Sequence, residues 1–288
     1  MQAEVATQDV TRFFAAIEKL QKSLHEAWSE HDGRPAAGSR AEAETRNLDR
    51  GNQAKSAHGY GYLTLLVADD HLTALTRLAV NPVSALAPAT CARAVLESAA
   101  LCSWLCDPSV SIEARVARMY AYRYDGLTQQ AKLNAINEPS IEQQIDAMER
   151  EALGLGYARL EKGGTRAGVG VKMPPTTGLI RTALELPSEY QFASVYKFLS
   201  GIVHGHYYAV SQFGFKEVDN PDPTSNDRLI SKHAHPVSLA LCGVNSVLAY
   251  SVALCSLSWL FGWGEILPLV ASAYEEMELN KIFEADHL

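Results

Sequence analysis

Apolar residues recur every three or four positions along most of the chain, which is the spacing of amphipathic helices. No stretch alternates apolar and polar residues for long enough to predict a sheet, and no repeat of fixed period occurs. The pattern therefore predicts an all-α protein, a multi-helix bundle. We predict helices from Thr7 or Asp9 to Trp28 and over 58–80, 88–107, 109–133, 140–153, 177–186 and 196–208.

Three stretches lack a sustained apolar period. Residues 31–57 are rich in Gly, Ala, Arg, Glu and Asn and have room for a short helix, whereas 154–175 and 214–235 are rich in turn-forming residues. The stretch 154–175 contains neither GxGxxG nor Gly-Lys-Ser/Thr, so no phosphate loop is indicated. We predict one helical domain over 1–288 with mobile connections near these three stretches.

The segment Val237 to Phe261 is uncharged, apolar and long enough to span a bilayer. Three of its polar residues, Ser238, Asn245 and Ser256, fall on one face of a helix, and no cluster of lysine and arginine flanks it. We therefore prefer a central apolar helix wrapped by others, with a membrane span as the alternative. A final helix over 266–283 is expected to close the bundle.

The net charge of −8 gives no general attraction to nucleic acid or to anionic lipid. A bound anion would therefore need a local cluster of arginines. The five cysteines form no Cys-x-x-Cys pair, and the N-terminal stretch lacks a basic segment followed by an apolar run. These features predict a cytoplasmic protein with reduced cysteines, and neither nucleic acid nor membrane is expected as a partner.

The strongest candidate site lies on the predicted helix 196–208. Tyr196, Ser200 and His204 are spaced at i, i+4 and i+8, with Tyr207 one turn further, so one helix face would carry phenol, hydroxyl and imidazole groups. A neutral imidazole beside a serine hydroxyl can act as a general acid or base. The alternative is a buried histidine that is simply hydrogen-bonded by its neighbours.

Arg93 and Glu97 are the only charged residues between Pro88 and Cys106 on the third predicted helix, and their i, i+4 spacing allows an ion pair. This pair either locks two helices or holds a carboxylate or phosphate. We expect its face to meet the Tyr196 helix. Arg118 belongs to a denser cluster of arginines and tyrosines and is a candidate binding residue, although most of that cluster is expected to be a solvated face.

Metal ligands are sparse in the predicted helices. The ligands to test are Glu97, His71 and His204, but the chain has no Glu-x-x-His of the kind that helical carboxylate bundles use. We therefore predict no metal and no cofactor.

Four segments together resemble a widespread bacterial family of uncharacterised helical proteins, over residues 60–260. They are Arg93-Ala-Val-Leu-Glu97, Trp104-Leu-Cys-Asp-Pro108, Glu113-Ala-Arg-Val-Ala-Arg118 and Tyr196-Lys-Phe-Leu-Ser200-Gly-Ile-Val-His204-Gly205. The helical layout is more distantly similar to HEPN domains, some of which are metal-independent ribonucleases. Those ribonucleases place an arginine and a polar residue before the histidine. Here Lys197 and Phe198 precede His204, so that motif is degraded or absent.

Two hypotheses follow. The first is a binding or interaction module, expected to be a homo-oligomer, in which a buried polar network holds a small anionic ligand. The second is a hydrolytic or phosphodiester-cleaving enzyme in which His204 is the general acid or base, Ser200 orients it or attacks, and Arg93 stabilises an anion. The candidate residues are Arg93, Glu97, Ser200 and His204 for the network or for catalysis, and Tyr196, Tyr207 and Arg118 for binding.

Overall fold

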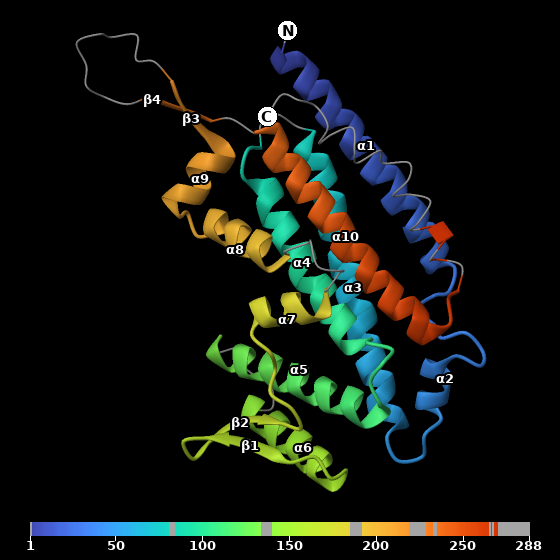
Figure 1. Ribbon diagram of the computed structural model, residues 1–288. Helices are drawn as coiled ribbons and strands as arrows, with labels where there is room; N and C mark the ends of the chain where they lie inside the picture. Colours follow the sequence, from blue (N-terminus) through green and yellow to red (C-terminus); the bar gives the residue numbers. More distant parts are fainter. Residues whose placement is uncertain are drawn as a thin grey trace.

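The computed structural model describes residues 2–80, 84–133, 140–184, 192–218, 229–232, 235–264, 266 and 268–269 (Figure 1). These residues form ten α-helices and two small antiparallel sheets. The helices are α1 (Gln2–Ser29), α2 (Arg40–Thr45), α3 (Gly51–Ala79), α4 (Ala87–Leu105), α5 (Ile112–Lys132), α6 (Ile141–Gly154), α7 (Thr176–Ala183), α8 (Phe192–Val203), α9 (Tyr207–Gly214) and α10 (Pro236–Phe261). The strands are β1 (Arg159–Lys162), β2 (Thr165–Val169), β3 (Phe215–Val218) and β4 (Leu229–Lys232).

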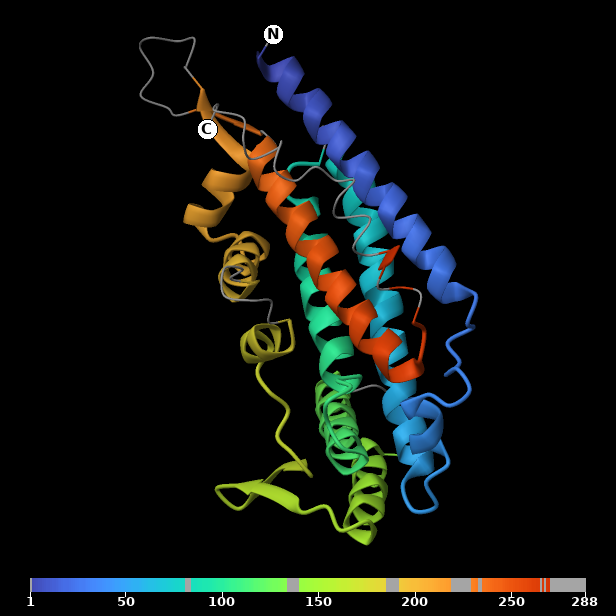
Figure 2. The ribbon, with the colours of Figure 1, turned by 45° about the vertical axis from the view of Figure 1, so that its right-hand side comes forward.

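The long helices α1, α3, α4 and α10 run along the long axis of the molecule in both ribbon views (Figures 1 and 2). Helix α10 packs against α1, α2, α3 and α4, and 78% of its most apolar stretch is buried. The Trp28 indole Nε1 donates to the Tyr250 hydroxyl at 2.9 Å, which joins α1 to α10. The predicted all-α bundle with a central apolar helix is therefore confirmed.

A second layer covers one side and one end of these four helices. Helices α7 and α8 pack on α4, and α5 packs on α3. Helix α6 and strand β2 both pack on α5. A separate apolar cluster fills this end of the molecule, and it includes Ala54, Val116, Met119, Tyr120, Ile145 and Met148. The end of α4 thus lies where the two layers meet.

The connection predicted over 31–57 holds more helix than expected. It contains α2, and α3 begins at Gly51 instead of His58. The positions of early α3 that face the core are Gly51, Ala54 and Ala57. Small residues there allow the neighbouring helix to approach closely, but they do not produce a stripe of large apolar residues that sequence analysis can detect.

Two β-hairpins correct the expectation that no sheet forms. In the first, Lys162 pairs with Thr165 across Gly163 and Gly164, whose φ angles are +59° and +75°. Positive φ at both positions is what a two-residue hairpin turn of the primed type requires, and glycine adopts it freely. In the second, β3 pairs with β4 from Phe215 and Lys232 to Val218 and Leu229. Both hairpins lie in stretches that we predicted to be connections.

Helix α8 ends at Val203, so residues 196–208 do not form the single helix that we predicted. Gly205 has a φ of +69°, its N–H donates to the Ile202 carbonyl, and the His206 N–H donates to the Gly201 carbonyl. These two bonds are the helix-ending arrangement known as the Schellman motif. The chain then turns into α9. The predicted final helix over 266–283 falls almost entirely outside the described residues.

Candidate functional site

The structure brings together three of the predicted site residues, from α4 and α8. The Arg93 Nε lies 2.9 Å from Glu97 Oε1, and the Tyr196 hydroxyl donates to the same carboxylate oxygen at 2.9 Å. The Arg93 Nη2 also donates to the Tyr196 hydroxyl at 3.4 Å. Burial, followed by the bond to Glu97, raises the pKa of Tyr196, so its phenol remains a donor at neutral pH.

These contacts make the Arg93, Glu97 and Tyr196 group a connection between α4 and α8. The side chains of Arg93 and Glu97 are 21% and 34% exposed, so solvent reaches both. Each charge has a partner of opposite sign within the group, which is the geometry of a structural ion pair. The expected meeting of these two helix faces is found.

Ser200 and His204 do not join this group as a buried network. Since α8 ends at Val203, His204 lies beyond the helix with an exposed side chain. Within the described part of the chain, no hydrogen bond links its imidazole to the Ser200 hydroxyl. The nearby rings are His206, at 6.4 Å between centroids, and Tyr208, which lies 6.1 Å from His206. An acid–base pair of Ser200 and His204 is therefore absent from this arrangement.

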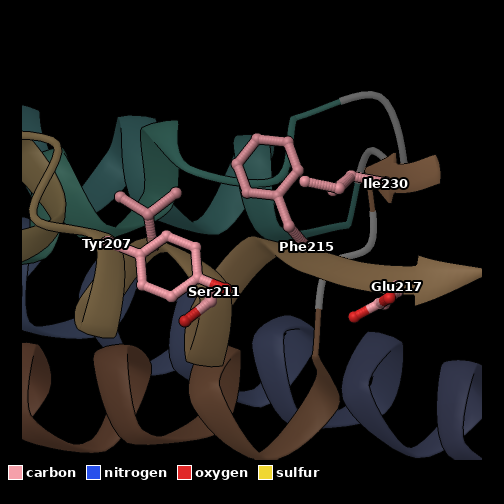
Figure 3. A pocket seen from close by; sticks show the side chains of 6 residues that line it. Tyr207, Ser211, Phe215, Glu217 and Ile230 are labelled. Atoms are coloured by element: carbon pink, nitrogen blue, oxygen red, sulfur yellow. The ribbon is translucent and has the colours of Figure 1, made fainter. Parts of the chain in front are cut away.

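Tyr207 is 80% exposed and lines a surface pocket of about 380 Å³. Figure 3 shows Tyr207 and Ser211 on α9, Phe215 and Glu217 on β3, and Ile230 on β4 around this pocket. The walls are mostly apolar. None of the described lining residues is a buried polar side chain without a hydrogen-bond partner. The pocket therefore has little with which to orient a polar ligand.

Arg118 lies at a second cavity, where α4, α5, α7 and α10 meet. Its Nη1 donates to the Trp104 carbonyl at 2.6 Å and to Asp107 Oδ2 at 3.2 Å, and its guanidinium lies 5.5 Å from the centre of the Trp104 ring. The cavity measures about 280 Å³. The described residues that line it are Ser103, Trp104, Asp107, Arg118, Thr182, Ala183 and Ser256.

Ser103 is the unusual member of this cavity. It is only 4% exposed, and its hydroxyl has no hydrogen-bond partner among the described residues. Buried hydroxyl groups in proteins are nearly always hydrogen-bonded, because burying one without a partner is unfavourable. The Asp107 carboxylate is ionised here, since the bonds from Ser109 and Arg118 outweigh its partial burial and lower its pKa. The cavity thus offers donors, acceptors and one charge of each sign.

A cluster of buried charged groups from α2, α3 and α5 was not predicted from the sequence. Arg115 belongs with Arg118 to the arginine and tyrosine cluster that we expected to be mostly a solvated face, but it is fully buried and binds Glu44 through Nε at 2.8 Å. His58 Nε2 lies 2.9 Å from the same Glu44 carboxylate. Burial alone would raise the pKa of Glu44, but His58 and Arg115 outweigh it and lower the pKa to about 2. Glu44 lies in a stretch that we had interpreted as a connection, so no sequence signal linked these residues.

Within the described residues, no group of three or more histidine, cysteine, aspartate and glutamate side chains is placed to hold a metal ion. Glu97, His71 and His204 are therefore not brought together as a ligand set.

Comparison with protein-family models, with characterised proteins and with solved structures finds no match to this chain.

Proposed function

We propose that this protein is a binding protein that holds a small carboxylate-bearing or phosphate-bearing ligand in the cavity beside Arg118. The observation that carries the proposal is the hydroxyl of Ser103, a residue that lines this cavity; this hydroxyl is buried and has no hydrogen-bond partner among the described residues. A ligand oxygen beside the Ser103 hydroxyl would give this hydroxyl a hydrogen-bond partner. Binding would thereby relieve an unfavourable feature of the ligand-free protein.

Arg118 supplies the charge that an anionic group needs. In the described structure its Nη1 makes both of its hydrogen bonds, to Trp104 and Asp107, while Nε and Nη2 have no hydrogen-bond partner. Their N–H groups suit the two oxygens of a carboxylate or phosphate, which arginine binds in a fork geometry. The Trp104 ring supports the guanidinium from one side and limits its movement.

Titration of the purified protein with acetate, lactate, single amino acids and inorganic phosphate tests the proposal. Tryptophan fluorescence and melting temperature both report binding, because Trp104 lines the cavity. The variant Arg118→Lys keeps the charge but loses the fork, and we expect it to weaken binding about tenfold. Arg123→Lys is the control, since Arg123 lies on the same helix and does not line the cavity.

The proposal predicts a saturable change with at least one of these compounds, weakened in Arg118→Lys and preserved in Arg123→Lys. The absence of any saturable change, or equal weakening in both variants, would overturn it. Circular dichroism confirms that each variant is folded before its binding is interpreted.

A further inference from the structure

We infer that the ligand of the Arg118 cavity is a zwitterion of amino-acid size, with a carboxylate that faces Arg118 and an ammonium that faces Asp107. This inference rests on the proposed function and specifies its ligand. It begins from the charges around the cavity, which are one guanidinium and one carboxylate only 3.2 Å apart among the described lining residues.

The paired charges set the net charge that the cavity accepts. Arg118 is already balanced by Asp107, so a ligand with net negative charge would lose hydration without gaining an uncompensated cation. A zwitterion adds one charge of each sign. Its carboxylate can approach Arg118 while its ammonium approaches Asp107, so the four charges alternate and the cavity remains neutral.

The hydrogen-bonding groups divide in the same way. The Arg118 N–H groups and the Ser103 hydroxyl can donate to a carboxylate. The Thr182 hydroxyl already donates to the Gly178 carbonyl at 3.0 Å, and the Ser256 hydroxyl donates to the Val252 carbonyl at 3.0 Å. Each of these two hydroxyl groups can therefore accept a hydrogen bond from a ligand but cannot donate one.

An ammonium group has three donors and no acceptor. The Asp107 carboxylate and the hydroxyl oxygens of Thr182 and Ser256 supply acceptors around the same cavity. Acceptors of this kind match an ammonium better than they match a second anionic group, which would find too few donors.

The volume of the cavity limits the ligand to a small metabolite. At about 280 Å³ it lies just below the range of about 300–1,000 Å³ that holds drug-sized ligands. A nucleotide is too large and too strongly charged for it. Trp104 and Ala183 are the apolar residues of a mostly polar lining, which suits a ligand with a short aliphatic side chain.

The test compares matched ligands on the whole protein. Isothermal titration calorimetry with the twenty amino acids identifies the tightest binder. The same compound without its amino group, and the same compound without its carboxylate, are then titrated. We expect the amino acid to bind at least about tenfold more tightly than either, as the loss of one charge-assisted interaction implies.

The variant Asp107→Asn keeps the shape of the side chain and makes the cavity net positive. We expect this variant to bind the amino acid about tenfold more weakly, because the ammonium interaction is lost. Its affinity for the compound without the amino group should be unchanged or higher. Ser103→Ala should weaken the binding of both compounds. Ser251→Ala is its matched control, since Ser251 is another buried serine without a described partner but does not line the cavity.

The outcomes separate the two claims. If the compound without the amino group binds as tightly as the amino acid, and Asp107→Asn changes the affinity for both compounds equally, the zwitterion inference is overturned and the proposed function stands. If no carboxylate or phosphate compound binds, both claims fall. Should Asp107→Asn not fold, the comparison of the three matched ligands on the unmodified protein decides alone.

Discussion

The guanidinium of Arg115 lies entirely inside the protein and is bound by groups from α2 and from the end of α4. It donates to Glu44 on α2, to the Leu105 carbonyl at the end of α4 at 2.7 Å, and to the Asp107 carbonyl at 2.9 Å. The exposed carbonyls at a helix C-terminus favour a cation, so Arg115 also completes the end of α4. Since Asp107 and Trp104 lie at that same end, Arg115 holds the wall of the Arg118 cavity in place.

Glu44→Gln should lower the free energy of unfolding by about 3–5 kcal/mol, because Arg115 would remain buried without its anionic partner. Urea denaturation followed by circular dichroism measures the change. The control is Glu26→Gln, which removes an exposed carboxylate 4.0 Å from Lys22 and should change stability by less than about 1 kcal/mol. Similar small losses in both variants would contradict this role of Glu44.

The pH dependence of stability should report on His58. Burial lowers the pKa of His58, and the bond to Glu44 only partly opposes that effect. The unfolded chain therefore takes up a proton at a higher pH than the folded protein does. Stability from this group is present above the ordinary histidine pKa of about 6.5 and is lost as the pH falls towards the lower folded value.

We expect the melting temperature to fall between pH 7 and pH 5 and the variant His58→Gln to show a shallower fall. Glu44 contributes separately, since its lowered pKa means that its stabilisation is lost only as the pH falls from about 4.5 to about 2. Parallel melting curves for the unmodified protein and His58→Gln over pH 5–7 would contradict the assignment to His58.

At the scale of elements, the packing of α3 on α4 includes a close approach at Gly61. A Cβ atom at Gly61 would collide with the Cys106 sulfur, whereas a Cβ at Gly59, on the same helix, would meet nothing within 4 Å. Glycine in the middle of a helix is unfavourable by itself, so its presence at position 61 is explained by this contact. The absence of a side chain at Gly61 thus allows α3 and the end of α4 to lie this close together.

Gly61→Ala should destabilise the protein by about 1–3 kcal/mol through overpacking, whereas Gly59→Ala should stabilise it by about 0.5–1 kcal/mol through helix propensity. Thermal denaturation of both variants checks the difference in sign. The double variant Gly61→Ala/Cys106→Ala removes the colliding sulfur and should recover part of the loss. Stabilisation by both glycine replacements would show that the helices separate easily.

The long helices were predictable because their core faces carry large apolar residues at regular spacing, as Phe13, Ile17 and Leu24 do in α1. The break after Val203 was not, because glycine and histidine occur both within helices and at their ends. The Gly163-Gly164 turn is a known hairpin signal, but the flanking strands are short, β1 is mostly exposed and β2 is buried only at its end, so the alternation that identifies a strand is missing.

The candidate site was predictable only where its residues share one helix. The Arg93 and Glu97 spacing predicted their pair, and we also expected the face of this pair to meet the helix that carries Tyr196. The Arg118 cavity brings together Ser103, Thr182 and Ser256 from three other helices. Such a grouping depends on how the helices pack, and helical spacing does not encode it.

At the scale of the whole molecule, the arrangement depends on the burial of α10. Cys242 is 1% exposed and burial raises its pKa, whereas Cys255, on the same helix, is partly exposed. In variants that keep only one of these cysteines, Cys242 should react with a thiol reagent at least about 10³-fold more slowly than Cys255, because its reaction requires unfolding.

Labelling with Ellman's reagent measures these rates, and both cysteines should react at similar rates in urea. Equal rates without urea would contradict the central position of α10. The homo-oligomer that we predicted from the sequence remains a prediction, and sedimentation of the same samples addresses it.

The place of α10 in the chain order has a consequence for synthesis. The ribosome delivers α1, α3 and α4 well before α10, yet these helices bury their apolar faces against it. A nascent chain that stops before Pro236 therefore exposes the surface that α10 covers, and such surfaces promote aggregation and recruit chaperones. We expect this protein to complete its folding late in translation, with the earlier helices held in a partly open state until α10 emerges.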